Sequence, residues 1–395
     1  GSPRALLWRV VWRAMPDRIS TVVDFIRPVA RDGVASMDGY HSPQLDVDVR
    51  LNTNESPLPP PDAFRRAVAA RAVDVVWHRY PDRAATALRT ALADAHGVAL
   101  AQVFAANGSN EVLQSLHLAY GGPGRSAAVF DPTYAMYAQI ARAIGTSVLR
   151  GTRDSGHRLV RGEVLALLVE KQPALVHLCS PNNPTGTVDP IELVIEVVDV
   201  VAGYGGLVVV DEAYGQFAST SVAGLLAEDR PLVVSRTFSK TWAMAGARLG
   251  FLLAPTWCVA ELEKVALPYH LDALKQAVGI LALEHGSAMD DRIVELVGER
   301  DRVAAALSDL GVTSWPSEAN FILFRPETRS GDEVWRSLVD RSVLVRNFTT
   351  MAGIEGCLRV TIGTADENDR FLQALTEILA GPPGEATDRP ATEGV

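Results

Sequence analysis

Residues 103 to 254 alternate short apolar runs with helical stretches, a pattern that few folds satisfy. A strand, a helix and then another strand is the order found in a parallel α/β sheet. Several of the runs are apolar on both faces, as central parallel strands are. We therefore predict an α/β fold with a large domain, built on a mostly parallel seven-stranded sheet flanked by helices. The strands are expected from Val103 and at 127–130, 146–149, 175–178, 207–210, 232–234 and 249–253.

The pattern changes after residue 320 and predicts a smaller α+β domain. Strands are expected at 320–324, 343–346 and 357–362, with helices at 332–341 and 367–379. Earlier helices are expected at 62–72, capped by Asp62, at 84–96, and from Pro190 with Asp189 as its cap. A long helical stretch, 255–310, should break near His285. We predict five segments: an N-terminal extension (1–26), an arm contributing to the small domain (27–60), the large domain (61–284), the small domain (285–380) and a disordered tail (381–395).

Composition excludes some classes of function. The net charge of -10 and pI near 5.4 argue against nucleic acid or an anionic membrane surface as the main partner. The apolar runs are too short, between charges, to cross a membrane. The three cysteines, Cys179, Cys258 and Cys357, have no metal-binding or disulfide spacing. A cytoplasmic protein without a metal is therefore expected.

The chain has only four lysines, and one of them stands apart from the rest. Lys171, Lys264 and Lys275 fit solvated helix positions. Lys240 follows an apolar strand, in a loop rich in hydroxyl groups. An amine there can be desolvated and used as a Schiff-base nucleophile. Because Thr237, Ser239 and Arg248 around it suit a phosphate, we hypothesise that Lys240 carries pyridoxal phosphate.

Polar residues follow the other predicted strands, where a doubly wound sheet binds its ligands. Ser109 opens a helix after Asn107-Gly108, which fits a phosphate site or an ordinary turn. Tyr134 could stack on a ring or pack under a loop. Asn183 lies between Pro181 and Pro184, which make the loop rigid, so that its side-chain amide can donate a hydrogen bond in a fixed direction. Asp211 follows an apolar strand, where a buried carboxylate would need a cation such as a protonated pyridine nitrogen. Alternatively, Asp211 would cap the next turn. Tyr214 would lie near the hydroxyl group of the pyridine ring.

Taken together, these residues make the sequence resemble the fold-type I aminotransferases that use pyridoxal phosphate, and more closely their histidinol-phosphate aminotransferase branch. The resemblance covers about residues 27 to 380. The matching strings are Leu51-Asn-Thr-Asn-Glu55, Arg79-Tyr80-Pro81-Asp82, Asn107-Gly108-Ser109, Asp131-Pro-Thr-Tyr134, Ser180 to Gly186, Asp211-Glu-Ala-Tyr214, Ser239-Lys240 with Arg248, and Cys357-Leu-Arg359-Val-Thr-Ile-Gly363-Thr.

The resemblance implies a role for each matching residue. Lys240 would form the Schiff base and shuttle protons, and Asp211 would pair with the pyridine nitrogen. The ring oxygen would be held by Asn183 and Tyr214, and Tyr134 would stack on the ring. The phosphate would be held by Ser109, Asn110, Thr237, Ser239 and Arg248, with Tyr80 from the partner subunit of a homodimer. The substrate would be held by Arg359, Arg346, Asn183 and Tyr40. Two of these have an equally good alternative, because Arg346 also fits a surface charge and Tyr40 also fits a packed aromatic side chain.

The substrates implied are a small amino donor such as histidinol phosphate and a 2-oxo acid acceptor such as 2-oxoglutarate. Because histidinol phosphate lacks the α-carboxylate of glutamate, Arg346 and Arg359 would have to accept either phosphate or carboxylate. Some residues depart from the family pattern. Asn110 replaces the usual acidic residue, Ser56 replaces a common asparagine, and Trp242 and Phe348 are bulky near the expected pocket mouth.

These departures leave alternatives. An aminotransferase for aromatic or secondary-pathway amino acids, or a decarboxylase of the threonine-phosphate type, would share the same motifs. A nicotinamide oxidoreductase would need a glycine fingerprint after a strand, but Gly121-Gly-Pro-Gly124 follows a helix and contains proline, so we predict a turn there. A binding or regulatory protein would not need the lysine, aspartate and arginine set.

Overall fold

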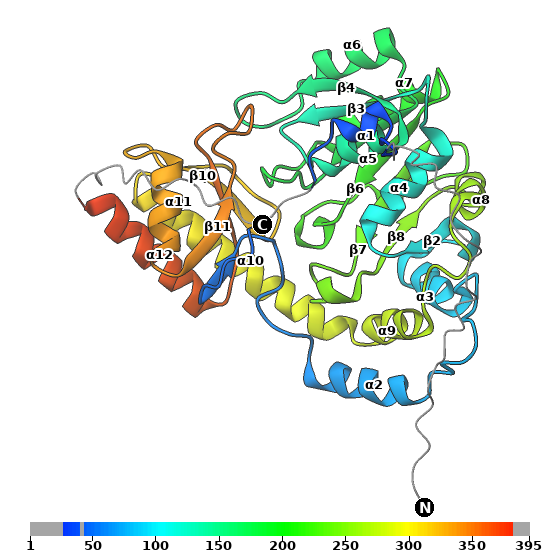
Figure 1. Ribbon diagram of the computed structural model, residues 1–395, viewed down its shortest axis with the longest axis horizontal. Coiled ribbons are helices and arrows are strands. Elements are labelled where there is room, and N and C mark those ends of the chain that lie inside the picture. Colours follow the sequence, from blue (N-terminus) through cyan, green and yellow to red (C-terminus); the bar gives the residue numbers. More distant parts are fainter. Residues whose placement is uncertain (1–26, 40–42, 382–395) are drawn as a thin grey trace, which may run out of the picture. The chain divides into compact units, whose positions relative to one another are not determined.

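A computed structural model describes residues 27–39 and 43–381 (Figure 1). The chain divides after Met37 into two compact units, and each is described by itself. The first contains a short helix, α1 (Asp32–Ala35). The expected N-terminal extension, Tyr40 and nearly all of the expected tail lie outside the described residues.

The second unit contains the predicted seven-stranded sheet, in the order β2-β8-β7-β6-β5-β3-β4 (Figure 1). Strand β8 runs antiparallel to both neighbours, while the β7-β6-β5-β3-β4 pairs are parallel. This sheet confirms the predicted fold class. Edge strand β4 extends three residues beyond its expected end, because its polar side chains are partly exposed and gave no apolar run. The strands are β2 (Val103–Ala106), β3 (Ser126–Asp131), β4 (Ser147–Thr152), β5 (Leu175–Cys179), β6 (Leu207–Asp211), β7 (Leu232–Thr237) and β8 (Gly250–Leu253).

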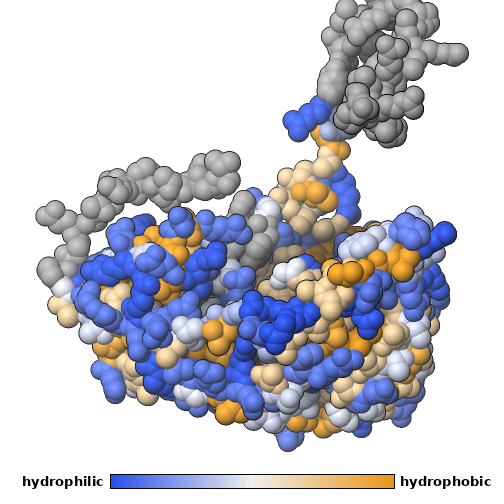
Figure 2. Space-filling model, turned by 90° about the horizontal axis from the view of Figure 1, so that it is seen from below, coloured by the Kyte–Doolittle hydropathy of each residue, from blue (hydrophilic) through white to orange (hydrophobic). Residues whose placement is uncertain are grey.

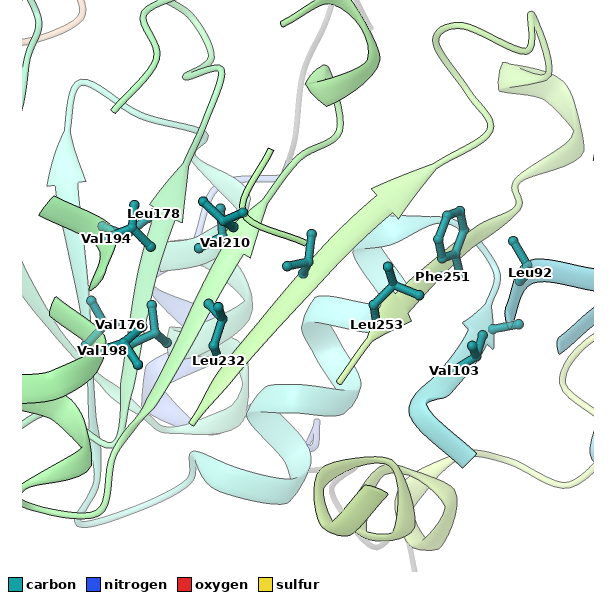
Figure 3. Close-up of a cluster of buried hydrophobic side chains, with 14 of the residues drawn as sticks. Leu92, Val103, Val176, Leu178, Val194, Val198, Val210, Leu232, Phe251 and Leu253 are labelled. Atoms are coloured by element: carbon teal, nitrogen blue, oxygen red, sulfur yellow. The ribbon is translucent and has the colours of Figure 1, made fainter. Parts of the chain in front are cut away.

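Helices cover both faces of this sheet, which explains why its central strands are apolar throughout. Along β6, Val208 and Val210 pack in one hydrophobic cluster, and Leu207 and Val209 pack in another on the opposite face. Figure 3 shows part of the first cluster, where Val194 and Val198 of a helix meet strand residues. That face carries α3 (Thr86–His96), α6 (Arg161–Lys171), α7 (Ile191–Ala202) and α9 (Ala273–Glu284), and the other carries α4 (Ser109–Tyr120), α5 (Met136–Ile144) and α8 (Thr256–Val265).

A second, five-stranded sheet has the order β1-β11-β12-β10-β9 and packs against three helices. Strand β1, from the N-terminal side of the chain, pairs in parallel with β11. The break expected near His285 separates α9 from the long helix α10, which runs toward this sheet (Figure 1). The elements are β1 (Val49–Leu51), β9 (Thr313–Ser314), β10 (Phe321–Arg325), β11 (Val343–Asn347), β12 (Leu358–Thr361), α10 (Gly286–Asp309), α11 (Gly331–Val339) and α12 (Ala365–Ala380), and α2 (Asp62–Val73) contacts α9.

Two expected helix caps were wrong. Helix α2 begins at Asp62 with Pro61 at its cap position, and α7 begins at Ile191 with Pro190 there. The carboxylate of Asp189 instead accepts two hydrogen bonds from Arg153, at 2.8 and 3.1 Å, and both side chains are 1% exposed. A buried carboxylate that meets a guanidinium in this two-pronged way is not available to cap a helix.

Hydrophobic and hydrophilic residues are interspersed on the face drawn in Figure 2. Of the helices in the described ranges, none combines the length and apolar character that a membrane span needs.

The Arg153–Asp189 pair yields a test of stability. Replacing Asp189 with alanine would leave the Arg153 charge buried without its counterion, so we expect a loss of about 3–5 kcal/mol. Urea unfolding followed by circular dichroism measures the change. Glu196→Ala is the matched control, because Glu196 pairs with Arg161 at the surface and its loss should change stability much less. Equal effects of the two substitutions would contradict this account.

Candidate active site

A cavity of about 200 Å³ lies where the two sheets contribute residues to one space. Lys240, Asp211 and Tyr214 come from the ends of β6 and β7, while Arg346 and Arg359 come from β11 and β12. The structure therefore brings together twelve of the fourteen residues expected from the sequence. They are Ser109, Asn110, Tyr134, Asn183, Asp211, Tyr214, Thr237, Ser239, Lys240, Arg248, Arg346 and Arg359.

The other two expected residues are placed differently. Tyr80 is 80% exposed and stacks on Tyr269, with ring centroids 4.4 Å apart. Tyr40 lies outside the described residues. Of the two bulky residues expected near the pocket mouth, Phe348 lines the cavity, but Trp242 packs against Phe238 in the hydrophobic core.

Lys240 is half-buried in the loop after β7. Its Nζ donates to the backbone oxygen of Thr53 at 3.2 Å and lies 5.7 Å from the centre of the Tyr214 ring. Burial, followed by the positive charge of Arg359, lowers the pKa of Lys240 to about 8. A fraction of this amine is therefore neutral, and able to act as a nucleophile, near neutral pH.

Asp211 ends β6 and is 3% exposed. Its carboxylate accepts hydrogen bonds from the Tyr137 hydroxyl at 2.8 Å and from the backbone N–H of Ala213 at 3.1 Å. Burial raises the pKa of Asp211 to about 6, because neutral donors do not balance a buried charge fully. A cationic group in the cavity would balance it.

Thr237, Ser239, Arg248 and the first turn of α4 form a candidate anion-binding site, the Arg248 seat. The hydroxyls of Thr237 and Ser239 are hydrogen-bonded at 3.0 Å, and Arg248 donates to Ser239 at 3.3 Å. Gly108 lies against the Arg248 guanidinium, and its φ of 80° favours glycine because a residue with a side chain would be strained there. Ser109 and Asn110 form the first turn of the twelve-residue helix, whose N–H groups and dipole favour an anion.

Two arginines occupy the other side of the site, on neighbouring strands. Arg346 and Arg359 are directly paired across β11 and β12. The Arg359 guanidinium donates to the Asn183 amide oxygen and, at 2.9 Å, to the backbone oxygen of Asn52. Both guanidinium groups pack on the Phe348 ring, 5.8 and 5.3 Å from its centre. The aromatic ring and these contacts orient the two charges for a planar anion.

Pyridoxal phosphate fits these residues. Its phosphate suits the Arg248 seat, its ring nitrogen can carry the positive charge that Asp211 requires, and its aldehyde suits the neutral amine of Lys240. Among the described residues, no group of three or more histidine, cysteine, aspartate or glutamate side chains could hold a metal ion.

Sequence reasoning missed several contacts. Thr53 and Asn54 line the cavity, although the sequence analysis matched their string to the family without giving either residue a role. Tyr137, which donates a hydrogen bond to Asp211, lies on α5 three residues after Tyr134, and the sequence analysis did not identify it. Lys275 is not solvated as expected, since its side chain is 17% exposed and donates to the Asn107 amide oxygen. Lys171 and Lys264 are exposed, as expected.

Comparison with known proteins identifies the family. Residues 47–375 match the family described as aminotransferase class I and II. The histidinol-phosphate aminotransferase of Frankia casuarinae is 46% identical over 367 residues, covering 89% of this chain and 90% of that protein. Its counterpart in Mycolicibacterium smegmatis is 45% identical over 361 residues, covering 89% of this chain and 93% of that protein.

Solved structures show the same fold. The histidinol-phosphate aminotransferase of Sinorhizobium meliloti, in complex with pyridoxal-5'-phosphate, superposes with a TM-score of 0.81 at 22% identity, covering 92% of this chain and 99% of that one. The L-threonine-O-3-phosphate decarboxylase of Porphyromonas gingivalis gives 0.74 at 20% identity, covering 85% and 100%. The chain thus belongs to the class I and II aminotransferases, as a pyridoxal phosphate-dependent enzyme of the branch that includes the histidinol-phosphate aminotransferases.

Proposed function

We propose that this enzyme transfers the amino group of histidinol phosphate, or of a closely similar amine, to a 2-oxo acid such as 2-oxoglutarate. The observation that carries the proposal is the pair of guanidinium groups, Arg346 and Arg359, in the cavity that Lys240 also lines. Because the two substrates present a phosphate and a carboxylate in turn, the site needs cations that bind either group, as arginine does. Relatives named as histidinol-phosphate aminotransferases, at 41–46% identity, support the choice of amine.

In this proposal the residues of the large sheet hold the cofactor and move the proton. Pyridoxal phosphate, when bound, supplies an electron sink for the bond broken at the substrate α-carbon. Asp211 stays ionised and holds the proton on the ring nitrogen, and the Lys240 amine takes a proton from the α-carbon and returns it. Tyr214 and Asn183 would hold the ring oxygen, and Tyr134 would contact the ring. The phosphate would be held by Ser109, Asn110, Thr237, Ser239 and Arg248.

The second sheet orients the substrate in this proposal. Arg359 binds the substrate anion and is itself aligned by its contacts with Asn52 and Asn183. Arg346 would provide a second anion contact, and Asn183, which lines the same cavity, would contact both cofactor and substrate. Tyr40 would close the pocket from the N-terminal arm. The proposed arm is 27–60, and the pairing of β1 with β11 supports placing its residues 49–51 with the small domain.

The substrate is tested by measuring glutamate formed from 2-oxoglutarate with histidinol phosphate, phenylalanine, tyrosine or leucine as donor. We expect a clear preference for histidinol phosphate. Arg346→Gln should lower kcat/KM for it about 10- to 100-fold, the effect of losing a hydrogen bond between charged groups. Arg341→Gln, which changes a surface arginine paired with Glu377, is the control and should have little effect.

Two results would overturn this substrate assignment. One is a strong preference for phenylalanine or tyrosine, which would make the enzyme an aromatic amino acid aminotransferase. The other is release of carbon dioxide from threonine phosphate without transamination, which would place it with the decarboxylases.

The lowered pKa of Lys240 predicts how cofactor loading depends on pH. The amine is charged below its pKa of about 8 and neutral above it, and only the neutral form attacks an aldehyde. The rate at which apo-enzyme gains cofactor absorbance should rise about tenfold per pH unit up to pH 8 and then level off. Arg359→Gln removes a neighbouring positive charge and should move the midpoint upward, while Lys240→Ala should give no such phase. A rise that continues toward pH 10 would contradict the lowered pKa.

We also propose a cytoplasmic homodimer in which Tyr80 reaches the phosphate seat of the partner subunit. Tyr80, Trp77 and Val73 are 80%, 70% and 82% exposed. Three large apolar side chains exposed within one short segment suit an interface.

Hybrid dimers test whether Tyr80 acts across subunits. Tyr80→Ala should bind pyridoxal phosphate weakly and Lys240→Ala should be inactive. If Tyr80 serves the partner, a hybrid of the two variants contains one site with both native residues and should have about half of the wild-type activity. Because about half of the dimers in a refolded equal mixture are hybrids, the mixture should recover about a quarter of the wild-type activity. A monomer in light scattering, or no restored activity, would contradict the proposal.

A further inference from the structure

Asn54 joins the N-terminal arm, the second sheet and the catalytic cavity. It is 1% exposed and has a left-handed backbone, with φ of 55°. Its side-chain Nδ2 donates to the Tyr214 hydroxyl oxygen at 2.9 Å. Its backbone oxygen accepts from the Asn320 amide at 3.2 Å, and its other contacts go to Thr361 on β12. A buried polar side chain with this many partners has one orientation.

The two hydrogen bonds to Thr361 determine which way the Asn54 amide faces. The Thr361 hydroxyl accepts from the Asn54 backbone N–H at 3.0 Å and donates its one hydrogen to Asn54 Oδ1 at 3.1 Å. In this arrangement the amide oxygen faces Thr361 and the amide nitrogen faces Tyr214. A reversed amide would place a donor against the Thr361 hydroxyl and an acceptor against Tyr214.

This direction decides what the Tyr214 hydroxyl can do. Because its oxygen accepts from Asn54, its own hydrogen remains available to an acceptor elsewhere, and Tyr214 lines the cavity. Burial raises the pKa of Tyr214, so that the phenol stays protonated and able to donate at neutral pH. An acceptor at the position of Asn54 would instead capture that hydrogen.

We propose that Asn54 and Thr361 are positioning residues that direct the Tyr214 hydroxyl to donate its hydrogen into the cofactor cavity. The proposal rests on the proposed role of Tyr214 at the cofactor ring oxygen. Thr361 and Arg359 are two residues apart on β12 and so face the same side of that strand. One strand therefore carries both the proposed substrate arginine and the hydroxyl that orients Tyr214.

The test uses the absorbance of bound pyridoxal phosphate as a function of pH, without amino substrate. A hydrogen bond donated to the ring oxygen favours the deprotonated form of the chromophore and so lowers the pH midpoint of its absorbance change. Thr361→Val removes the hydroxyl, keeps the shape and allows the Asn54 amide to turn. It should raise the pH midpoint by about one unit, the size of one hydrogen bond. Thr361→Ser retains the hydroxyl and should keep the wild-type midpoint.

Two further variants separate this role from general loss of stability. Asn54→Asp keeps the side-chain shape and the tolerance of a left-handed backbone, but it offers only acceptors to Tyr214. It should raise the midpoint at least as much as Thr361→Val. Val360→Ala opens a hole in the hydrophobic cluster at the neighbouring position of β12. It should lower thermal stability without moving the midpoint.

A double substitution decides whether the effect passes through Tyr214. In a Tyr214→Phe background the hydroxyl is absent, so Thr361→Val should cause no further shift. A wild-type midpoint for Thr361→Val, or an equal shift with and without the Tyr214 hydroxyl, would overturn the proposal. Because no amine is added, a wrong choice of substrate would leave this result unaffected and would appear only in the transamination assay.

Discussion

The buried carboxylate of Asp211 is the constraint on which the rest of this structure depends. It ends a central strand whose residues are buried on both faces, so the charge has little access to water. The Tyr137 hydroxyl and the Ala213 N–H donate hydrogen bonds to the carboxylate but, being neutral, do not balance its charge. Burial raises the pKa of Asp211 to about 6. Keeping a carboxylate in such a place is costly unless a cation meets it. In the proposed function the ring nitrogen of pyridoxal phosphate would supply that cation, which would tie the position of Asp211 to the chemistry of the family.

The two sheets divide the work of the site. The seven-stranded sheet places Asp211, Lys240 and the Arg248 seat at one edge, because the loops that follow its strands open into the same cavity. The five-stranded sheet contributes Arg346 and Arg359 from adjacent strands. Backbone oxygens of Asn52 and Thr53 in the arm accept from Arg359 and Lys240. The arm thus connects the charge assigned to the substrate with the amine assigned to the cofactor.

Residues at strand ends could be predicted because their position follows from the local pattern. Lys240 and Asp211 each follow an apolar run, and the order of runs placed them at the same edge of the sheet. Contacts between distant parts of the chain left no such sign. Asn54 meets Tyr214 across 160 positions and Thr361 across 307. Nothing within a few residues of Asn54 indicates either partner.

Two of the wrong predictions, for Asp189 and Lys275, have the same origin. Asp189 precedes a proline and a helix, which is a good local pattern for a cap, but its carboxylate pairs with Arg153, 36 positions away. Lys275 lies on a helix, and only the fold brings the Asn107 side chain to it across 168 positions. Local patterns describe what a segment can do alone, whereas buried charge and amide groups take whichever partner the fold supplies.

The central claim is that Lys240 is the residue that binds the cofactor covalently. Holoenzyme can be reduced with borohydride, which makes the bond between a lysine and pyridoxal phosphate permanent, and then digested for mass spectrometry. The account predicts that the pyridoxyl phosphate mass is found on the peptide containing Lys240. Its presence on Lys275 instead, the other lysine with a largely buried side chain, or the absence of any labelled peptide from reduced holoenzyme, would contradict the account.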